Sequence, residues 1–267
     1  MTKDPETDEF IMIVQFANEG NLRSILSTNF NNILWKDKVR FLYGIIINLK
    51  NLHGLEYCHK DFHSGNILQG DAIYLSDFGL SRPADEQRSD GKIYGVLPYI
   101  APEVLNGEPY TKASDIYSLG VIMTELSSGK PPFYDKKHDL SLVLDICNRL
   151  RPEFGKGTPE FYKKLAYRCM NANPNQRPTI SELFDIFDFW RESIKYNYDE
   201  KIYRYYETKE AFKEADKEIP NISTSYKRDP DAIYTSRAFA FRNLPRPINS
   251  SLVTSYFEKD EGIIYIY

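Results

Sequence analysis

The sequence predicts a mainly helical α+β fold with a few short strands. Seven segments predict helices, and in most of them apolar residues recur three and four positions apart, the spacing of one buried helix face. Apolar runs that fit strands are short, and the clearest covers residues 10–14. The 267 residues are 42% apolar and 14% aromatic, which is enough for the core of one or two domains.

The first part of the chain predicts a strand followed by two helices. Residues 10–14 fit a buried strand because the run is unbroken and rich in β-branched residues. Polar residues and Gly20 end it, and Asn21 is placed to cap a short helix over residues 22–26. Residues 37–53 carry a wide apolar face, so we expect a largely buried helix there.

Residues 59–79 hold the densest group of polar side chains. Asp61 and Asn66 fall on one loop, a short apolar hairpin follows, and Asp77 stands at the end of its second strand. Three oxygen-bearing side chains can therefore converge on one point. Oxygen ligands in this number suit Mg²⁺, which takes its other ligands from water and from substrate phosphates. The stretch thus predicts a site for a magnesium ion and a phosphate.

Four further helices follow a long polar loop over residues 81–92. They are expected over residues 114–127, over 138–150, from 158 onward and from 179 to about 190. Gly129 and the two prolines after it stop the first of these helices. Pro159 fits the first helical position of the third, and Thr179 with Glu182 forms a capping box at the fourth.

After Trp190 the chain becomes charged and rich in tyrosine. Residues 191–217 predict an exposed helix, and residues 220–267 mix Ser, Asn, Pro and Tyr without a period, which predicts poor order. We therefore expect one packed domain over residues 1–192 and a tail over residues 193–267 that is part helical and part disordered.

Composition argues against several classes of protein. A formal net charge of −4 provides no electrostatic footprint for nucleic acid, and no apolar run approaches a membrane span. The polar, acidic start does not fit a secretory signal. The cysteines are scattered and odd in number, which is typical of a reducing compartment. We expect a cytoplasmic protein with no nucleic-acid or membrane partner.

The polar stretch belongs to a series of motifs along the chain. In order, these are His59-Lys60-Asp61 with Asn66, Asp77-Phe78-Gly79, Ala101-Pro102-Glu103, Asp115 with Gly120, and Arg177-Pro178. The series resembles the signature set of protein kinases in order and spacing, over about residues 10–192. Residues 13–16 and 20–22 look most like the tyrosine-kinase-like group. The resemblance implies a kinase large lobe with its hinge and a buried Glu103–Arg177 ion pair.

The resemblance implies phosphoryl transfer from ATP with Mg²⁺ as the metal. Asp61 would be the base that accepts the proton of the substrate hydroxyl, and Asn66 and Asp77 would bind the metal. His63 would touch the γ-phosphate as a pH-dependent donor. The plainer interpretation of the carboxylates and the amide is that they cap turns. That of His63 is a solvent-facing loop residue.

The resemblance also implies where adenine would bind. Gln15 and Ala17 would meet it through backbone groups, with Val14 at the back of the pocket. Leu68 would form the floor beneath the ring, although a plain core leucine is a nearly equal interpretation.

Some residues depart from the family pattern. His63 stands where Lys or Ala is usual, and Val96 stands where serine/threonine kinases usually carry Thr, so the acceptor specificity stays open between Ser/Thr and Tyr. Lys60 replaces an Arg, which would grip a phosphate with a bidentate fork. Control by phosphorylation of the loop is therefore less strongly implied; its candidate hydroxyls are Ser81, Ser89 and Tyr94.

No Gly-x-Gly-x-x-Gly loop and no Val-Ala-Ile-Lys-like strand precedes residue 10. In the family these parts cover the ATP phosphates, and one preorganised donor is worth about 2.7–4 kcal/mol in rate. We therefore expect a kinase domain without its small lobe, and little activity from this chain alone.

The sequence thus predicts an ATP-dependent protein kinase that acts on Ser or Thr hydroxyls, with Tyr as the other acceptor. Its expected partners are ATP, a protein substrate and other signalling proteins. The retained Asp61, Asn66 and Asp77 favour the enzyme. The absent lysine and glycine-rich loop favour an alternative, a catalytically inactive scaffold that binds partners. A third interpretation is a regulatory fragment that competes with a full-length relative for substrates.

Overall fold

The computed structural model describes residues 2–11, 15–83, 91–196, 203–241, 243–249 and 254. Within these residues the fold is mainly helical with short strands, as the sequence predicts. The helices are α1 (Leu22–Asn29), α2 (Trp35–Gly54), α3 (Pro102–Leu105), α4 (Lys112–Ser128), α5 (Leu140–Cys147), α6 (Glu160–Cys169), α7 (Ile180–Lys195) and α8 (Tyr203–Glu218). The strands are β1 (Thr2–Lys3), β2 (Phe10–Ile11), β3 (Gly20–Asn21), β4 (Tyr57–Cys58), β5 (Ile67–Gln69), β6 (Ile73–Leu75), β7 (Arg82–Pro83), β8 (Ile93–Gly95) and β9 (Arg237–Phe239).

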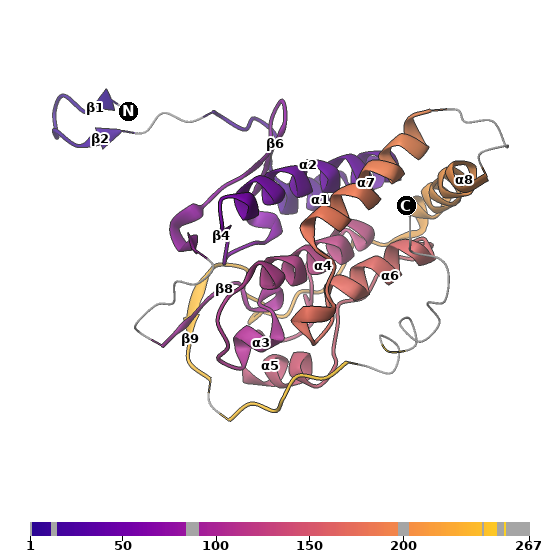
Figure 1. The fold of residues 1–267 in the computed structure, drawn as a ribbon. Helices are drawn as coiled ribbons and strands as arrows, with labels where there is room; N and C mark the ends of the chain where they lie inside the picture. The colour runs from indigo at the N-terminus through magenta and orange to yellow at the C-terminus, as the bar shows by residue number, and fades with distance from the viewer. Residues whose placement is uncertain are drawn as a thin grey trace.

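Helix α4 lies at the centre of the core and is buried along almost its whole length (Figure 1). Gly120 lets α6 approach it closely, because a Cβ at this position would lie 2.7 Å from Met170 Cγ and 2.8 Å from Cys169 Cβ. Helix α2 packs against α4 and α7, and α7 packs against α8. None of the described helices is both long and apolar enough to cross a membrane.

The predicted helices occur, with ends shifted by a few residues. The Asn21 side chain caps α1, and Thr179 caps α7 by accepting the backbone N–H of Glu182 at 3.1 Å. Pro159 is the N-cap of α6 rather than its first helical residue, because its ψ of 141° is extended. The single exposed helix predicted over residues 191–217 is wrong, since α7 ends at residue 195 and α8 begins at residue 203.

The strand predicted over residues 10–14 is described only at its start. There β2 pairs antiparallel with β1, and the two form a hairpin that stands away from the helices (Figure 1). No layer covers Phe10, which is 74% exposed, so the prediction of a buried strand is wrong at this residue. Residues 12–14 lie outside the described part of the chain.

A small antiparallel sheet in the order β3-β5-β6 contains the predicted hairpin. Ile67 at the start of β5 pairs with Leu75 at the end of β6. The loop before β5 and Asp77 after β6 therefore lie at the same end of the hairpin. The hairpin rests on α2, where Gly44 leaves room for Ile73.

The C-terminal segment lies against the helical body. Phe212 of α8 packs edge-on to Phe161 and tilted against Trp35, with ring centroids 5.2 and 5.6 Å away. Farther on, β9 pairs antiparallel with β8, and Tyr234 is buried. Residues 220–241 and 243–249 thus differ from the expectation of poor order, because an extended segment that pairs with a neighbour needs no period of its own. The domain boundary at residue 192 stays a prediction.

Candidate active site

One carboxylate of α4 accepts hydrogen bonds from the backbone of the loop over residues 59–66. Asp115 Oδ2 accepts the backbone N–H of His59 at 2.9 Å, and Oδ1 accepts that of Lys60 at 3.2 Å. Asp115 Oδ2 also lies 2.9 Å from His53 Nε2 of α2. Lys60 has a φ of 68°, a region that is unfavourable for a residue with a side chain. The two backbone bonds to Asp115 hold the loop in this strained conformation.

His59 supports the loop through ring packing and one polar contact to the backbone. Its ring packs tilted against those of Phe62 and Phe78, with centroids 5.6 and 5.2 Å away. Its Nε2 lies 3.1 Å from the carbonyl oxygen of Ser76. Burial lowers the pKa of His59 below its ordinary value, so the ring is neutral at pH 7. The loop and the segment before Asp77 are thus joined through one neutral imidazole.

Asp61 offers an oxygen without a hydrogen bond. The residue is 4% exposed, and within the described residues its buried Oδ1 has no hydrogen-bond partner. His63 Nε2 lies 3.6 Å from Asp61 Oδ1. Because Nδ1 of His63 accepts the N–H of Gly65 at 3.0 Å, the neutral ring carries its proton on Nε2, facing Asp61. A buried acceptor left open in this way fits a group that receives a proton.

Asn66 and Asp77 are brought to the same end of the hairpin. The side-chain amide of Asn66 donates to the Asp61 carbonyl oxygen at 3.0 Å. The backbone carbonyl oxygen of Asn66 accepts from the N–H and the Oγ of Ser76, at 2.9 and 3.0 Å. Asp77 follows with a φ of 60° and is exposed. Within the described residues no group of three His, Cys, Asp or Glu side chains could hold a metal alone.

The residues predicted around adenine are described in part. Val14 lies outside the described residues. Gln15 is exposed and Ala17 is half-buried against the hairpin, where a Cβ on Gly70 would lie 3.5 Å from Ala17 Cα. Leu68 is half-buried and pairs with Asn21 of β3. Leu68 therefore lies within the β3-β5-β6 sheet, and Ala17 lies beside the turn of the hairpin.

A buried polar cluster on the other side of the loop has no counterpart in the sequence-based predictions. Glu125 of α4 accepts from Ser64 Oγ at 2.9 Å and from the Tyr99 hydroxyl at 2.6 Å. Arg23 of α1 lies 3.9 Å from the same carboxylate. Burial holds the pKa of Glu125 above its ordinary value despite the charge of Arg23. An acidic residue within the otherwise apolar α4 is the signal that could have identified Glu125.

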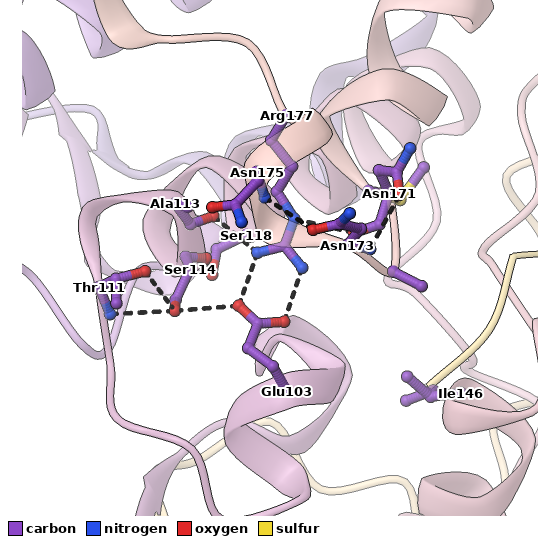
Figure 2. A network of polar contacts seen from close by, with 12 residues as sticks. Glu103, Thr111, Ala113, Ser114, Ser118, Ile146, Asn171, Asn173, Asn175 and Arg177 are labelled. Carbon is purple, nitrogen blue, oxygen red and sulfur yellow. Dashed lines mark hydrogen bonds and ion pairs between the residues drawn. The ribbon is translucent and has the colours of Figure 1, made fainter. Parts of the chain in front are cut away.

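The predicted Glu103–Arg177 ion pair is confirmed (Figure 2). The two groups meet in a bidentate geometry, with Nη1 at 2.7 Å from Oε1 and Nη2 at 2.6 Å from Oε2. Arg177 also donates to the carbonyl oxygens of Asn171 and Ala113, each at 2.9 Å. Ser114 Oγ donates to Glu103 at 3.2 Å. The pair thus ties α3, after the long loop, to the start of α4 and to the segment before α7.

Comparisons with known proteins agree with this arrangement. The family model of the protein kinase domain matches residues 3–186. A probable serine/threonine-protein kinase of Dictyostelium discoideum is 29% identical over 177 residues, or 65% of this chain and 11% of that protein. A putative serine/threonine-protein kinase/receptor of Acanthamoeba polyphaga mimivirus is 30% identical over 176 residues, or 64% of this chain and 11% of that protein.

A third relative matches a longer part of the chain. The serine/threonine-protein kinase fray1 of Dictyostelium discoideum is 30% identical over 202 residues, which cover 72% of this chain and 35% of that protein. The chain therefore spans between 11% and 35% of the length of these three relatives.

Proposed function

The chain belongs to the protein kinase domain family, and on this premise we propose that it transfers the γ-phosphoryl group of ATP to serine or threonine hydroxyls of proteins. The family uses ATP and a divalent metal, and the three relatives carry serine/threonine kinase names. Within the family, the pattern of residues 13–16 and 20–22 supports the tyrosine-kinase-like group. Tyrosine is the second acceptor class, since Val96 and His63 do not follow the serine/threonine pattern.

One observation carries the proposal: the open, buried Oδ1 of Asp61 in a loop fixed by Asp115. A carboxylate held in this way can take the hydroxyl proton as the oxygen attacks phosphorus, without rearranging first. His63 Nε2 lies 3.6 Å from Asp61 Oδ1, so its single N–H can donate either to that carboxylate or to a phosphate oxygen placed beside it. The strained Lys60 backbone supports the same preorganisation.

The residues around Asp61 fit ATP with Mg²⁺. Asn66 and Asp77 would hold the metal, which supplies charge compensation between the phosphates. Two protein oxygens suit a metal that takes its remaining ligands from phosphates and water. Gln15 and Ala17 would meet adenine through their backbone, and Leu68 would lie beneath it. Exposed Asp77 leaves the metal position open to the nucleotide.

The test is phosphoryl transfer from labelled MgATP to a generic protein substrate. We expect Asp61→Asn to lower the initial rate by about 10²-fold or more, the contribution of a general base. Asp71→Asn is the matched control, because Asp71 is an exposed carboxylate in the turn of the same hairpin. Equal thermal melting curves would show that both variants fold. Transfer that survives Asp61→Asn at the wild-type rate would overturn the assignment.

Nucleotide binding provides an independent measurement. Asp77→Ala is expected to abolish the part of ATP binding that depends on Mg²⁺, measured by calorimetry with and without the metal. Binding that stays metal-dependent in this variant would exclude Asp77 as the ligand.

A scaffold that binds partners without chemistry is the second candidate. Phe16 and Phe78 lie near the proposed nucleotide position and are 82% and 50% exposed, so they offer apolar contact surface. The two functions differ in one measurement: a scaffold would show no transfer that depends on Asp61. We also propose a cytoplasmic location, which the free thiols of Cys58, Cys147 and Cys169 support.

A further inference from the structure

The C-terminal segment over residues 226–241 runs along the lobe and passes the proposed catalytic loop. Its strand β9 pairs antiparallel with β8, so that Arg237 lies opposite Gly95 and Phe239 opposite Ile93 (Figure 1). Strand β8 belongs to the stretch between Asp77 and Glu103. The segment has thus added a strand to the same part of the chain that borders the proposed site, as peptides do when they bind by β-augmentation.

A second anchor lies just before β9. Tyr234 is 8% exposed, and its hydroxyl donates to the carbonyl oxygen of Pro132 at 2.9 Å. Its ring lies edge-on to His138 at 4.8 Å between centroids, and Arg23 lies 4.9 Å from the ring centroid. Arg23 Nη1 also donates to the Tyr234 carbonyl oxygen at 3.1 Å. Side chain and backbone of Tyr234 are therefore both fixed.

Upstream contacts hold the segment in the same path. The backbone N–H of Asp229 donates to the Tyr134 carbonyl oxygen at 2.8 Å, and that of His138 donates to the Asp231 carbonyl oxygen at 3.1 Å. His138 Nδ1 lies 2.8 Å from the Ile233 carbonyl oxygen. The segment from residue 229 to residue 239 is therefore attached at several points, most of them through its backbone.

Both anchors lie beside the loop that carries Asp61. On the side of Tyr234, a Cβ on Gly65 would lie 3.4 Å from Arg23 Nη1, the atom that holds the Tyr234 carbonyl. On the side of β9, the Tyr110 hydroxyl donates to the Tyr94 carbonyl oxygen of β8. Four residues after β8, Tyr99 contacts the catalytic loop: its hydroxyl lies 3.2 Å from Ser64 Oγ, and its ring centroid lies 5.8 Å from that of His63.

Only Thr235 and Ser236 separate the two anchors, and both are exposed. Ser236 is the residue directly before the strand, so the pairing of Arg237 with Gly95 fixes its position relative to β8 more closely than that of Thr235. Two exposed hydroxyls thus lie on a short stretch of chain that is anchored at both ends beside the catalytic loop.

We propose that Ser236 is a phosphoryl acceptor of this chain's own active site. The inference rests on the proposed kinase function and deepens it by naming a substrate in the same molecule. Ser236 Oγ would form the new bond to the γ-phosphorus of ATP while the bond from that phosphorus to the β–γ bridging oxygen breaks. The hydroxyl proton passes to Asp61, and MgADP leaves.

Intramolecular presentation favours this reaction even when the catalyst is slow. An acceptor held beside the base reacts as if it were present at a very high concentration, because its translational and rotational freedom is already lost. The rate constant for Ser236 should therefore not depend on the concentration of the chain. Transfer between separate molecules would instead accelerate in proportion to it.

The experiment incubates the full chain with MgATP at several chain concentrations and measures phosphate at each residue by mass spectrometry. A generic protein substrate is tested in parallel. We expect phosphate on Ser236, with the same rate constant over a tenfold range of concentration. It should be lost in Ser236→Ala and Asp61→Asn and kept in Thr235→Ala. A signal that persists in Asp61→Asn, or a rate that rises with concentration, would overturn the proposal.

A pair of proline variants tests the role of the strand. Ala238→Pro removes a backbone donor within β9, and Ala240→Pro places the same residue just past its end, at an equally exposed position. We expect Ala238→Pro to lower phosphorylation of Ser236 at least tenfold, while Ala240→Pro phosphorylates Ser236 at nearly the wild-type rate. Both variants should transfer phosphate to the generic substrate at nearly the wild-type rate. Equal rates for the two variants would overturn presentation by the strand.

The remaining outcomes separate this inference from the proposed function. If the generic substrate is phosphorylated while the chain carries phosphate on Thr235 instead of Ser236, or on neither residue, the assignment of Ser236 is overturned and the kinase function stands. Phosphate on neither the chain nor the substrate overturns both.

Discussion

Removal of the arginine from the Glu103–Arg177 pair should destabilise the fold far more than loss of an ion pair that reaches the surface. Arg177→Met would remove both bonds to Glu103 and the donors for two backbone carbonyl oxygens. The side chains of Arg177 and Glu103 are 0% and 11% exposed, so water cannot replace these partners. Among the residues that the structure describes, Glu103 would keep only the hydroxyl of Ser114. We expect a loss of roughly 3–5 kcal/mol in the free energy of unfolding.

Arg168→Met is the matched control for this substitution. Arg168 also pairs with a glutamate, Glu182, but the two side chains are 21% and 33% exposed. Solvent can take over the bonds of a pair that reaches the surface, and such pairs contribute about 1 kcal/mol or less. The same change from Arg to Met should therefore cost several times less at this position.

Equilibrium unfolding in urea measures both variants, and the double variant Glu103→Leu with Arg177→Met completes a cycle. Because that variant leaves no isolated charge, it should lose less stability than Arg177→Met alone. The reasoning is refuted if Arg177→Met costs no more than Arg168→Met. It is also refuted if the effects of Glu103→Leu and Arg177→Met on the free energy of unfolding simply add, so that the double variant is less stable than Arg177→Met by the full effect of Glu103→Leu.

Three further substitutions test other parts of the structure. Burial lowers the pKa of Lys38 from 10.5 to about 7, so the unfolded chain holds this proton more tightly, and the free-energy cost of burying the charged amine is largest below pH 7. Lys38→Met should therefore be more stable than wild type below pH 7, by at most about 4–5 kcal/mol. Urea unfolding should show this difference in stability shrinking as the pH rises from 7 to 10. Gly120→Ala should lower the melting temperature because its Cβ would meet α6 at 2.7–3.0 Å, whereas Gly54→Ala, with nothing within 4 Å, should not. Asp115→Asn should slow phosphoryl transfer at least tenfold although Asp61 itself is unchanged, because an amide has one acceptor oxygen for the two backbone N–H groups that the carboxylate holds. A rate equal to wild type would contradict the role of Asp115 in supporting the loop.

Local patterns were sufficient for much of the helical architecture. The segments over residues 37–53 and 114–127 became α2 and α4 because apolar periodicity and end signals act within one helix. Motif spacing placed Asp61, Asn66 and Asp77 near one end of a hairpin, and the Ile67–Leu75 pairing agrees with that placement. The Glu103–Arg177 pair could be named across 74 residues only through the family resemblance.

The neighbours of the loop could not be predicted from local pattern. Asp115 and Glu125 lie on the buried α4, and a sequence does not show which backbone N–H or hydroxyl a carboxylate on a distant helix will accept. Their roles depend on how α4 crosses beneath residues 59–66, which packing decides.

Local sequence patterns were enough for most of the helices before residue 190 and for the set of oxygen-bearing side chains around Asp61, because periodicity and motif spacing are properties of short stretches. What lies against that loop depends on how distant segments pack together. Residues 234–239 have no helical or strand period, and their path depends on the free edge of β8 and on the position of Arg23. A strand gains most of its hydrogen bonds from its neighbour, so its place is a property of the partner as much as of its own residues.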